Sequence, residues 1–262
     1  MFLEAVFVEK RAEVDVAKQK KPLRDLVREV SGLPATSAMT LAESIASPGL
    51  GIIAEIKRRS PSRGNLGCEM STQELARAYE RAGAAAISVL TDGAHFGGSL
   101  ADLQRAREVT SLPLLRKDFI IDEYQLFEAK AYGADAILLI VGLLKPEELA
   151  RLLSVAREIG LDALVEVHSE EELERAFSAG ADIIGVNSRD LRTLAVDTAA
   201  FYRLIPLIPE GSLSVAESGI SQPDELRALR ELGADAALIG TALASCDDPE
   251  RKLKEFVSGV KE

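Results

Sequence analysis

The residues best suited to chemistry are charged pairs placed where buried strands are expected to end. The segment "IIAEIKRRSPSRG" (52–64) begins as an apolar strand, yet it contains Glu55 and Lys57, whose two-residue spacing points both to one side. Two later apolar runs end near Lys117 and Glu166. Carboxylates and ammonium groups crowded in a partly desolvated site perturb one another's pKa. The pattern therefore predicts general acid–base chemistry near neutral pH.

A repeat indicates the scaffold that would position these side chains. Each copy has a helical tail, a glycine, a small residue and an apolar run. The glycine is typical of a helix C-cap, and the run is typical of a parallel strand buried on both faces. The copies recur about every fifty residues, twice the length of a βα unit of about 25–30 residues. They are "RAGAAAISVL" (81–90), "AYGADAILLIV" (131–141), "SAGADIIGVN" (178–187) and "ELGADAALIG" (231–240).

The intervening units complete the pattern. They are "LGIIAEIK" (50–57), "LPLLRKDF" (112–119), "LDALVEVH" (161–168) and "SLSVAESG" (212–219). Ser71 with Glu74 and Ser169 with Glu172 are typical of capping boxes, and Pro146 fits a first helical turn. Eight strands, each followed by a helix, predict an α/β fold, a (β/α)8 TIM barrel. A doubly wound open sheet is the alternative, and it is disfavoured because the repeat continues through the last unit.

Residues 1–47 precede the first strand and are expected to be helical in three stretches, "MFLEAVFVEKRAEVDVAKQKK", "PLRDLVREV" and "SAMTLAESIASPG". No composition typical of a linker separates them from the rest. We expect an N-terminal helical extension that packs against the barrel and across one end of it. The whole chain, 1–262, is then a single domain.

Composition narrows the class of protein. The chain has 262 residues, 47% of them hydrophobic, and a formal net charge of −11, which disfavours nucleic acid or an anionic membrane as partner. A small anionic substrate needs only a few cations and backbone N–H groups, and is compatible. Two cysteines, no signal-like N-terminus and no apolar stretch of about 20 residues predict a cytoplasmic protein. We expect a monomer rather than an obligate oligomer.

In such barrels the chemistry lies at the carboxyl ends of the strands. Charged or polar residues end five of the eight predicted strands, with both signs of charge, which favours catalysis for the group although any one ion pair can be structural. They are Glu55, Lys57, Arg116, Lys117, Asp118, Glu166, His168, Asn187, Arg189, Glu217 and Ser218.

Two further features indicate the ligand. Gly219 and Gly240, with Ser218 and Thr241, lie after the seventh and eighth strands, where backbone N–H groups of many barrels bind phosphate. An apolar set near the same mouth can line a slot for a flat aromatic group, although each member alone also fits rim packing. That set is Pro61, Phe96, Phe119, Leu138, Leu191 and Leu238.

Other chemistries are disfavoured. His95 and His168 are not at metal-ligand spacing, so no metal is predicted and each is interpreted as a loop or rim residue. Cys68 and Cys246 have no histidine partner nearby in the sequence, which disfavours a thiol nucleophile. No P-loop or GxGxxG fingerprint appears. We expect no metal and no organic cofactor.

Taken together, "IIAEIKRRSPSRG", "HFGGSLADL", "LPLLRKDFIIDEYQ", "ALVEVH", "IIGVNSRDLRT", "VAESGI" and "ALIGTAL" resemble indole-3-glycerol-phosphate synthase, the indole-forming family of tryptophan biosynthesis. The resemblance covers nearly the whole chain. It implies a carboxy-lyase that needs no cofactor. Its substrate would be 1-(2-carboxyphenylamino)-1-deoxyribulose 5-phosphate, which cyclises to indole-3-glycerol phosphate with loss of CO₂ and water.

The resemblance also implies roles for individual residues. Lys117 matches the general acid at the ketone oxygen, and Glu166 the carboxylate that transfers a proton during dehydration. Glu55 and Lys57 match the strand-one pair, in which Lys57 is either the dehydration acid or a phosphate and orientation contact. The remaining matches are Ser60, Asn187 and Arg189 around the anthranilate carboxylate, Glu217 and Ser218 nearby, Gly219, Gly240 and Thr241 at the phosphate, and the apolar six at the aniline ring.

Two other functions remain open at this point. One is a Schiff-base aldolase that uses Lys117 or Lys57 as its nucleophile. The other is a non-catalytic barrel that binds a phosphorylated ligand and acts as a partner subunit.

Overall fold

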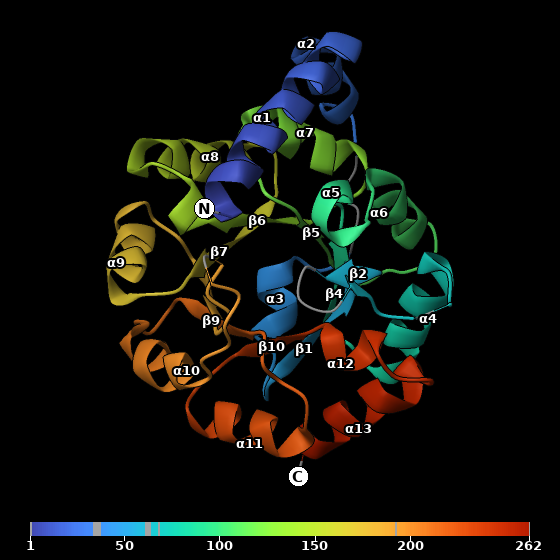
Figure 1. Cartoon of the computed structure of the whole chain (residues 1–262), viewed down its shortest axis with the longest axis vertical. Coiled ribbons are helices and arrows are strands. Elements are labelled where there is room, and N and C mark those ends of the chain that lie inside the picture. Colours follow the sequence, from blue (N-terminus) through green and yellow to red (C-terminus); the bar gives the residue numbers. More distant parts are fainter. Residues whose placement is uncertain (1, 34–37, 61–63, 68, 192, 262) are drawn as a thin grey trace.

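Eight parallel strands close into a barrel with the order β1-β10-β9-β8-β7-β6-β5-β4. Figure 1 shows the barrel at the centre of the molecule. The computed structural model describes residues 2–33, 38–60, 64–67, 69–191 and 193–261. The (β/α)8 barrel is therefore confirmed, and the doubly wound sheet is wrong. The barrel strands are β1 (Gly51–Ile56), β4 (Ala86–Leu90), β5 (Leu114–Lys117), β6 (Ala136–Ile140), β7 (Asp162–Val167), β8 (Ile183–Asn187), β9 (Leu213–Glu217) and β10 (Ala236–Ile239).

A ring of helices covers the outside of the barrel (Figure 1). In chain order these are α4 (Thr72–Ala82), α6 (Leu100–Arg107), α7 (Glu123–Ala131), α8 (Pro146–Glu158), α9 (Glu170–Ser178), α10 (Ala199–Leu204), α11 (Pro223–Glu231) and α13 (Pro249–Lys261). Shorter elements lie in the connections: β2 (Arg59–Ser60), β3 (Gly64–Asn65), α5 (Gly93–Phe96), η1 (Val141–Leu143), η2 (Ile205–Leu207) and α12 (Thr241–Ala244). None of the described helices is long and apolar enough to cross a membrane.

The repeated glycines behave as their positions predict. Gly83, Gly133, Gly180 and Gly233 all have φ between 82° and 93°, in the left-handed region that side chains disfavour. Each therefore ends one helix and turns the chain into the next buried strand. This local rule, repeated along the chain, explains why the barrel could be read from the sequence.

Two of the three predicted helix starts are confirmed in full. Ser71 and Glu74 form a capping box, and Pro146 begins α8. Ser169 caps α9 by accepting the Glu172 amide at 3.2 Å, but the Glu172 carboxylate accepts the backbone N–H of His168 at 2.8 Å. The predicted reciprocal bond to Ser169 is thus wrong, because the carboxylate turns toward the end of β7.

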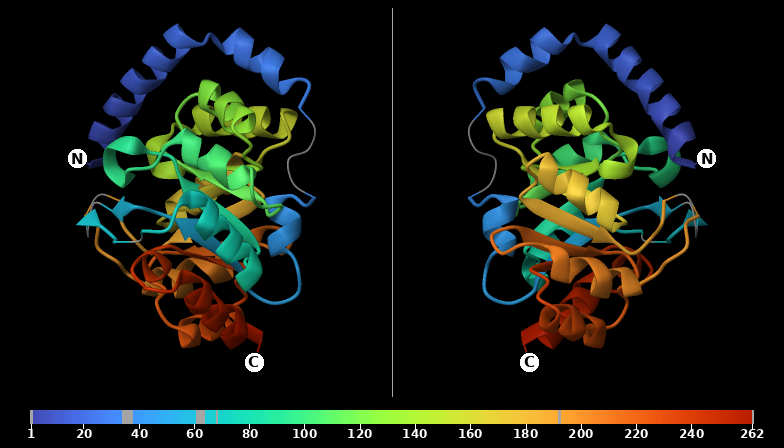
Figure 2. Two further views of the ribbon diagram at one scale, coloured as in Figure 1. Left: turned by 90° about the vertical axis from the view of Figure 1, so that its right-hand side faces the viewer. Right: turned by 90° about the vertical axis from the view of Figure 1, so that its left-hand side faces the viewer.

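The N-terminal segment contributes three helices: α1 (Phe2–Lys20), α2 (Leu23–Val30) and α3 (Leu41–Ile45). Figure 2 shows α1 and α2 outside the barrel, where Val14 and Leu26 pack with Tyr124 of α7. Helix α3 instead places Leu41 and Ile45 in the apolar cluster inside the barrel. This cluster includes Ile53, Ala86, Ala136, Ile183 and Ala236, which lie near the amino ends of their strands. Helix α3 therefore closes the amino end and leaves the carboxyl end open.

Candidate active site

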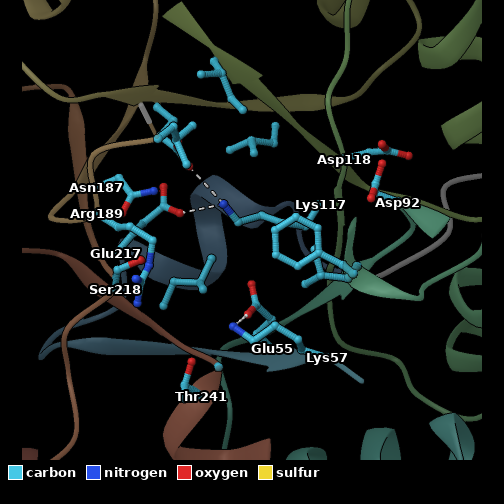
Figure 3. Close-up of a pocket in the computed structure, with 18 of the residues that line it drawn as sticks. Glu55, Lys57, Asp92, Lys117, Asp118, Asn187, Arg189, Glu217, Ser218 and Thr241 are labelled. Atoms are coloured by element: carbon cyan, nitrogen blue, oxygen red, sulfur yellow. Dashed lines mark hydrogen bonds and ion pairs between the residues drawn. The ribbon is translucent and has the colours of Figure 1, made fainter. Parts of the chain in front are cut away.

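A cavity of about 1030 Å³, including its open mouth, lies at the carboxyl ends of the strands (Figure 3). It brings together most of the residues predicted from the sequence, which come from seven strands and from the connections that follow the barrel strands. Those that line it are Glu55, Lys57, Phe96, Lys117, Phe119, Leu138, Glu166, Asn187, Arg189, Leu191, Glu217, Ser218, Gly219, Leu238, Gly240 and Thr241.

Two predicted substrate contacts are not placed by the structure. Ser60 ends the short strand β2, but its side chain is outside the described part of the chain. Pro61 lies wholly outside the described residues. Their expected roles stay predictions.

Lys117 is the centre of the charged side of the pocket. As the last residue of β5, it sends its ammonium group across the barrel, where Nζ lies 3.0 Å from Glu166 Oε2 and 2.9 Å from Glu217 Oε2. Glu166 comes from β7 and Glu217 ends β9, and each side chain is only 1% exposed. One buried cation is thus shared by two buried carboxylates, as the dashed lines in Figure 3 show.

The pKa values of the two carboxyl groups shift in opposite directions. Burial raises the pKa of Glu217 to about 7. The positive charge of Lys117 works against this rise, and the negative charge of Glu166 adds to it. Burial also favours the neutral form of Glu166, but Lys117 and His168 lower its pKa below the usual value. Burial alone would lower the pKa of Lys117, yet the surrounding carboxylates raise it. A carboxylate, a titrating acid and an ammonium group therefore coexist near neutral pH.

The second charged pair lies beside the first. Lys57 Nζ is 2.6 Å from Glu55 Oε1, and both side chains are largely buried at the end of β1. A side chain at Gly240 would place Cβ 2.1 Å from Glu55 Oε1 and 2.9 Å from Lys57 Nζ. Gly240 therefore provides the space in which this ion pair sits.

A second glycine, which the sequence analysis did not single out, does the same for Glu217. A Cβ built on Gly185 in the middle of β8 would lie 2.1 Å from Glu217 Oε1. Glycine inside a strand often marks a close approach by another group. Here the approaching group is a carboxylate of the pocket.

The connections after β9 and β10 form the adjoining wall of the pocket, where Figure 3 shows Ser218 and Thr241. Ser218 and Gly219 have φ of 67° and 74°, so two consecutive residues adopt the left-handed conformation. For a serine this conformation is costly, on the order of 1–2 kcal/mol. Helix α12 begins at Thr241, directly after β10. Backbone amide groups are thus concentrated at this wall.

The apolar wall comes from the loops after β4 and β5. The rings of Phe96 and Phe119 lie 6.2 Å apart and are tilted by 40°. Asp92 caps α5 by accepting the His95 amide at 2.7 Å, which fixes the short helix that carries Phe96. This wall can hold a flat, weakly polar group.

Five lining residues were not predicted from the sequence, namely Leu90, Asp92, Ile140, Leu194 and Ile220. Asp118 also lines the pocket, and it was predicted only as a strand-end charge. The two aspartates are held from outside the pocket by Lys10 of α1, whose Nζ lies 3.1 Å from Asp92 and 3.0 Å from Asp118. Asp92 could have been found from the sequence, because it is a polar residue close to the end of a strand. No local pattern signals Lys10, because its partners are remote in the sequence.

His168 was interpreted as a loop or rim residue, and it lies in the connection just beyond β7. Its side chain is 18% exposed, and its Nε2 lies 3.5 Å from Glu166. His168 was also noted as a strand-end residue, but its contact with Glu166 was not predicted. Among the described residues, no group of three or more histidine, cysteine, aspartate or glutamate side chains is placed to hold a metal ion.

An acid–base pocket at the carboxyl end of a (β/α)8 barrel defines this chain as a barrel enzyme. Its sequence matches the profile of the family described as indole-3-glycerol phosphate synthase over residues 3–256. It is 46% identical over 257 residues to the indole-3-glycerol phosphate synthase of Parafrankia sp. (strain EAN1pec), covering 98% of this chain and 95% of the relative. It is 52% identical over 213 residues to that of Nocardioides sp. (strain ATCC BAA-499 / JS614), covering 81% and 82%. The chain belongs to the indole-3-glycerol phosphate synthase family, whose members are lyases.

Solved structures with the same architecture are more distant in sequence. Thiamine phosphate pyrophosphorylase from Pyrococcus furiosus superposes with a TM-score of 0.62 at 20% identity, covering 81% of this chain and 96% of that chain. A chain of the tryptophan synthase complex from the same organism gives 0.61 at 17% identity, covering 80% and 98%. At these identities the likeness shows the fold alone.

Proposed function

We propose that this enzyme converts 1-(2-carboxyphenylamino)-1-deoxyribulose 5-phosphate into indole-3-glycerol phosphate, releasing CO₂ and water. The observation that carries the assignment is the Lys117 ammonium group, held between Glu166 and Glu217 inside a pocket that also has an apolar wall and an amide-rich wall. The amide-rich wall suits the phosphate, the apolar wall suits the aromatic ring, and the charged side chains suit proton transfer.

Binding fixes the two ends of the substrate. The phosphate is assigned to the turn at Ser218 and Gly219 and to the start of α12, where backbone N–H groups favour an anion. The aniline ring is assigned to the wall of Phe96 and Phe119. Asn187 and Arg189, at the end of β8, are assigned to the polar edge and carboxylate of the ring. Anchoring both ends brings the reacting carbons into contact, which lowers the entropic part of the barrier.

Ring closure then needs an acid at the ketone oxygen. The aromatic carbon attacks the ketone carbon while Lys117 gives a proton to the oxygen, and CO₂ leaves from the attacking carbon. Glu217, whose pKa is raised to about 7 and whose Oε2 lies 2.9 Å from Lys117 Nζ, returns a proton to the lysine.

Dehydration needs a base and an acid together. Glu166, kept ionised by Lys117, accepts the proton that the intermediate loses. The ammonium group of Lys57, beside Glu55, protonates the departing hydroxyl group, which leaves as water. No step requires an oxidant, a reductant or a further reactant.

The test is turnover by the purified chain. Indole fluorescence should grow when the substrate is added, and Lys117→Ala should lower kcat by about 10²–10⁴-fold while changing KM little. Lys254→Ala, at an exposed lysine of α13, is the matched control and should keep kcat. Absence of turnover by the wild-type chain would favour a non-catalytic binding role.

The aldolase alternative has a separate test. A Schiff-base lysine attacks as a neutral amine, whereas the carboxylates around Lys117 raise its pKa and keep it charged. Borohydride added with a sugar phosphate should therefore leave Lys117 and Lys57 unmodified. A covalent adduct on either lysine would count against the cyclase.

A further inference from the structure

Glu166 contacts a different basic side chain at each of its two oxygens. Oε2 lies 3.0 Å from Lys117 Nζ in the pocket, and Oε1 lies 3.5 Å from His168 Nε2 on the side away from it. His168 does not line the cavity and has no role in the mechanism above. It is a partly buried titratable group directly behind the proposed base.

Glu172 of α9 fixes the orientation of the imidazole ring. Its Oε2 accepts the His168 backbone N–H at 2.8 Å and lies 3.2 Å from Nδ1. A carboxylate only accepts hydrogen bonds, so Nδ1 must carry the hydrogen. This contact explains why the Glu172 carboxylate does not complete the capping box of α9.

The remaining nitrogen then has a defined task. His168 Nε2 and Glu166 Oε1 are both buried, and neither has a hydrogen-bond partner in the described part of the chain. If neither carried a proton, a buried lone pair would face a buried negative oxygen across 3.5 Å, which is costly. One proton must therefore lie between these two atoms, on the nitrogen or on the oxygen.

The surrounding charges decide where that proton rests. The charged groups around His168 are Glu166 on β7, Glu172 on α9 and Glu217 on β9, with Lys117 of β5 beyond Glu166. Burial would lower the pKa of His168, but Glu172, Glu166 and Glu217 raise it above its usual value. The three negative groups therefore favour the imidazolium form.

We propose that His168 is protonated at neutral pH and points its Nε2–H at Glu166, and that this keeps Glu166 in the ionised form required of a base. His168 acts through Glu166 and touches no substrate, so it is a positioning residue. The inference rests on the proposed role of Glu166 in dehydration. Its physical part, the coupling of His168 to Glu166, can be measured without any substrate.

The coupling is tested by NMR titration of the imidazole groups. The chain has two histidines, so two sets of imidazole signals are expected, and His95→Gln assigns them. In Glu166→Gln the pKa of His168 should fall by about one unit, because a neighbouring negative charge is removed. The signal of His95 serves as the internal reference. An unchanged His168 titration would overturn the proposal even if the substrate assignment is right.

The catalytic consequence is tested by the pH profile. Without the imidazolium, burial raises the pKa of Glu166, so the acidic limb of kcat should move up by about one unit in His168→Leu. At pH values below the wild-type acidic limb this variant should lose about ten-fold in kcat, and at neutral pH it should lose little, with little change in KM at either pH. If folded His168→Leu has the same pH profile of kcat as the wild type, the proposal is overturned. If His168→Leu does not fold, His168→Gln carries the same test, because it keeps a donor but not the charge.

The two measurements separate the two proposals. If the wild-type chain does not turn over the substrate, the NMR titration still shows whether the pKa of His168 depends on the charge of Glu166. If turnover is seen but the coupling is absent, the function stands and the role of His168 is rejected.

Discussion

The two ends of the barrel both contain buried side chains, but of opposite chemistry. At the amino end, which we call the floor, Leu41 and Ile45 of α3 pack into an apolar cluster with the starts of the strands. At the carboxyl end, which we call the mouth, Lys117, Glu166 and Glu217 are nearly as buried. The same strands therefore run from an apolar plug to a cluster of charges.

Along the barrel axis, the side chains that stabilise the fold are therefore separated from those that carry out the chemistry. Apolar burial at the floor is favourable, about 25 cal/mol per Å² removed from water. Burial of charges at the mouth costs several kcal/mol per ion, which mutual attraction only partly offsets. We expect floor substitutions to change the free energy of unfolding and to leave kcat unchanged, and mouth substitutions to lower kcat.

The largest expected effect on stability is at the floor. Ile45→Ala removes a side chain that is 1% exposed and leaves a cavity beneath the strands. The free energy of unfolding should fall by about 2–5 kcal/mol, measured by urea unfolding. The kcat below the melting temperature should match the wild type. Val8→Ala, at a side chain 68% exposed on α1, is the control and should change neither quantity. A large loss of kcat in Ile45→Ala would mean that floor and mouth are coupled.

The corresponding test at the mouth is Gly185→Ala. The new methyl group would lie 2.1 Å from Glu217 Oε1, so the carboxylate must move away from Lys117. We expect kcat to fall about 100-fold, or about 2.7 kcal/mol, because a displacement near 1 Å is that costly for aligned groups. Gly32→Ala, where nothing lies within 4 Å of the added carbon, should retain full activity. Activity that survives in Gly185→Ala would show that Glu217 is not needed in its observed place.

The pH dependence of stability should arise at the mouth. Glu217 titrates near 4.5 in an unfolded chain and near 7 when folded. Between these values the folded state binds the extra proton, so this contribution to stability is full below pH 4.5 and is lost as pH rises to 7. Glu217→Gln removes it. The stability of the wild type relative to this variant should fall by about 3 kcal/mol from pH 4.5 to pH 7. A difference that does not vary with pH would contradict the raised pKa.

The sequence predicted well those features that local patterns encode. The left-handed glycines such as Gly83 and Gly233, together with apolar runs of strand length, specify each βα unit, and eight units leave few topologies. Charges at strand ends could then be assigned to one mouth, because parallel strands end together. Lys117, Glu166 and Glu217 were found in this way, from three segments remote in the chain.

What the sequence did not predict depends on packing between remote elements. Gly185 is required by a carboxylate on the neighbouring strand, and Lys10 reaches Asp92 and Asp118 from a helix outside the barrel. Glu172 fits a capping box by spacing alone, but in three dimensions the end of β7 competes for its carboxylate. Spacing along the chain identifies which residues can meet, whereas the choice among possible partners is made by the folded structure.

The smallest expected effect concerns how α3 is held at the floor. Thr40 and Glu43 form a capping box, in which the Thr40 hydroxyl accepts the Glu43 amide at 3.1 Å. Thr40→Ala should lower the free energy of unfolding by about 1 kcal/mol, because one amide at the start of a short helix loses its partner. Thr40→Ser keeps the hydroxyl and should be close to neutral. Both variants should keep the wild-type kcat, measured in the same fluorescence assay. If Thr40→Ala instead lowers kcat in proportion to stability, the plug at the amino end also shapes the mouth, and the separation between the two ends fails.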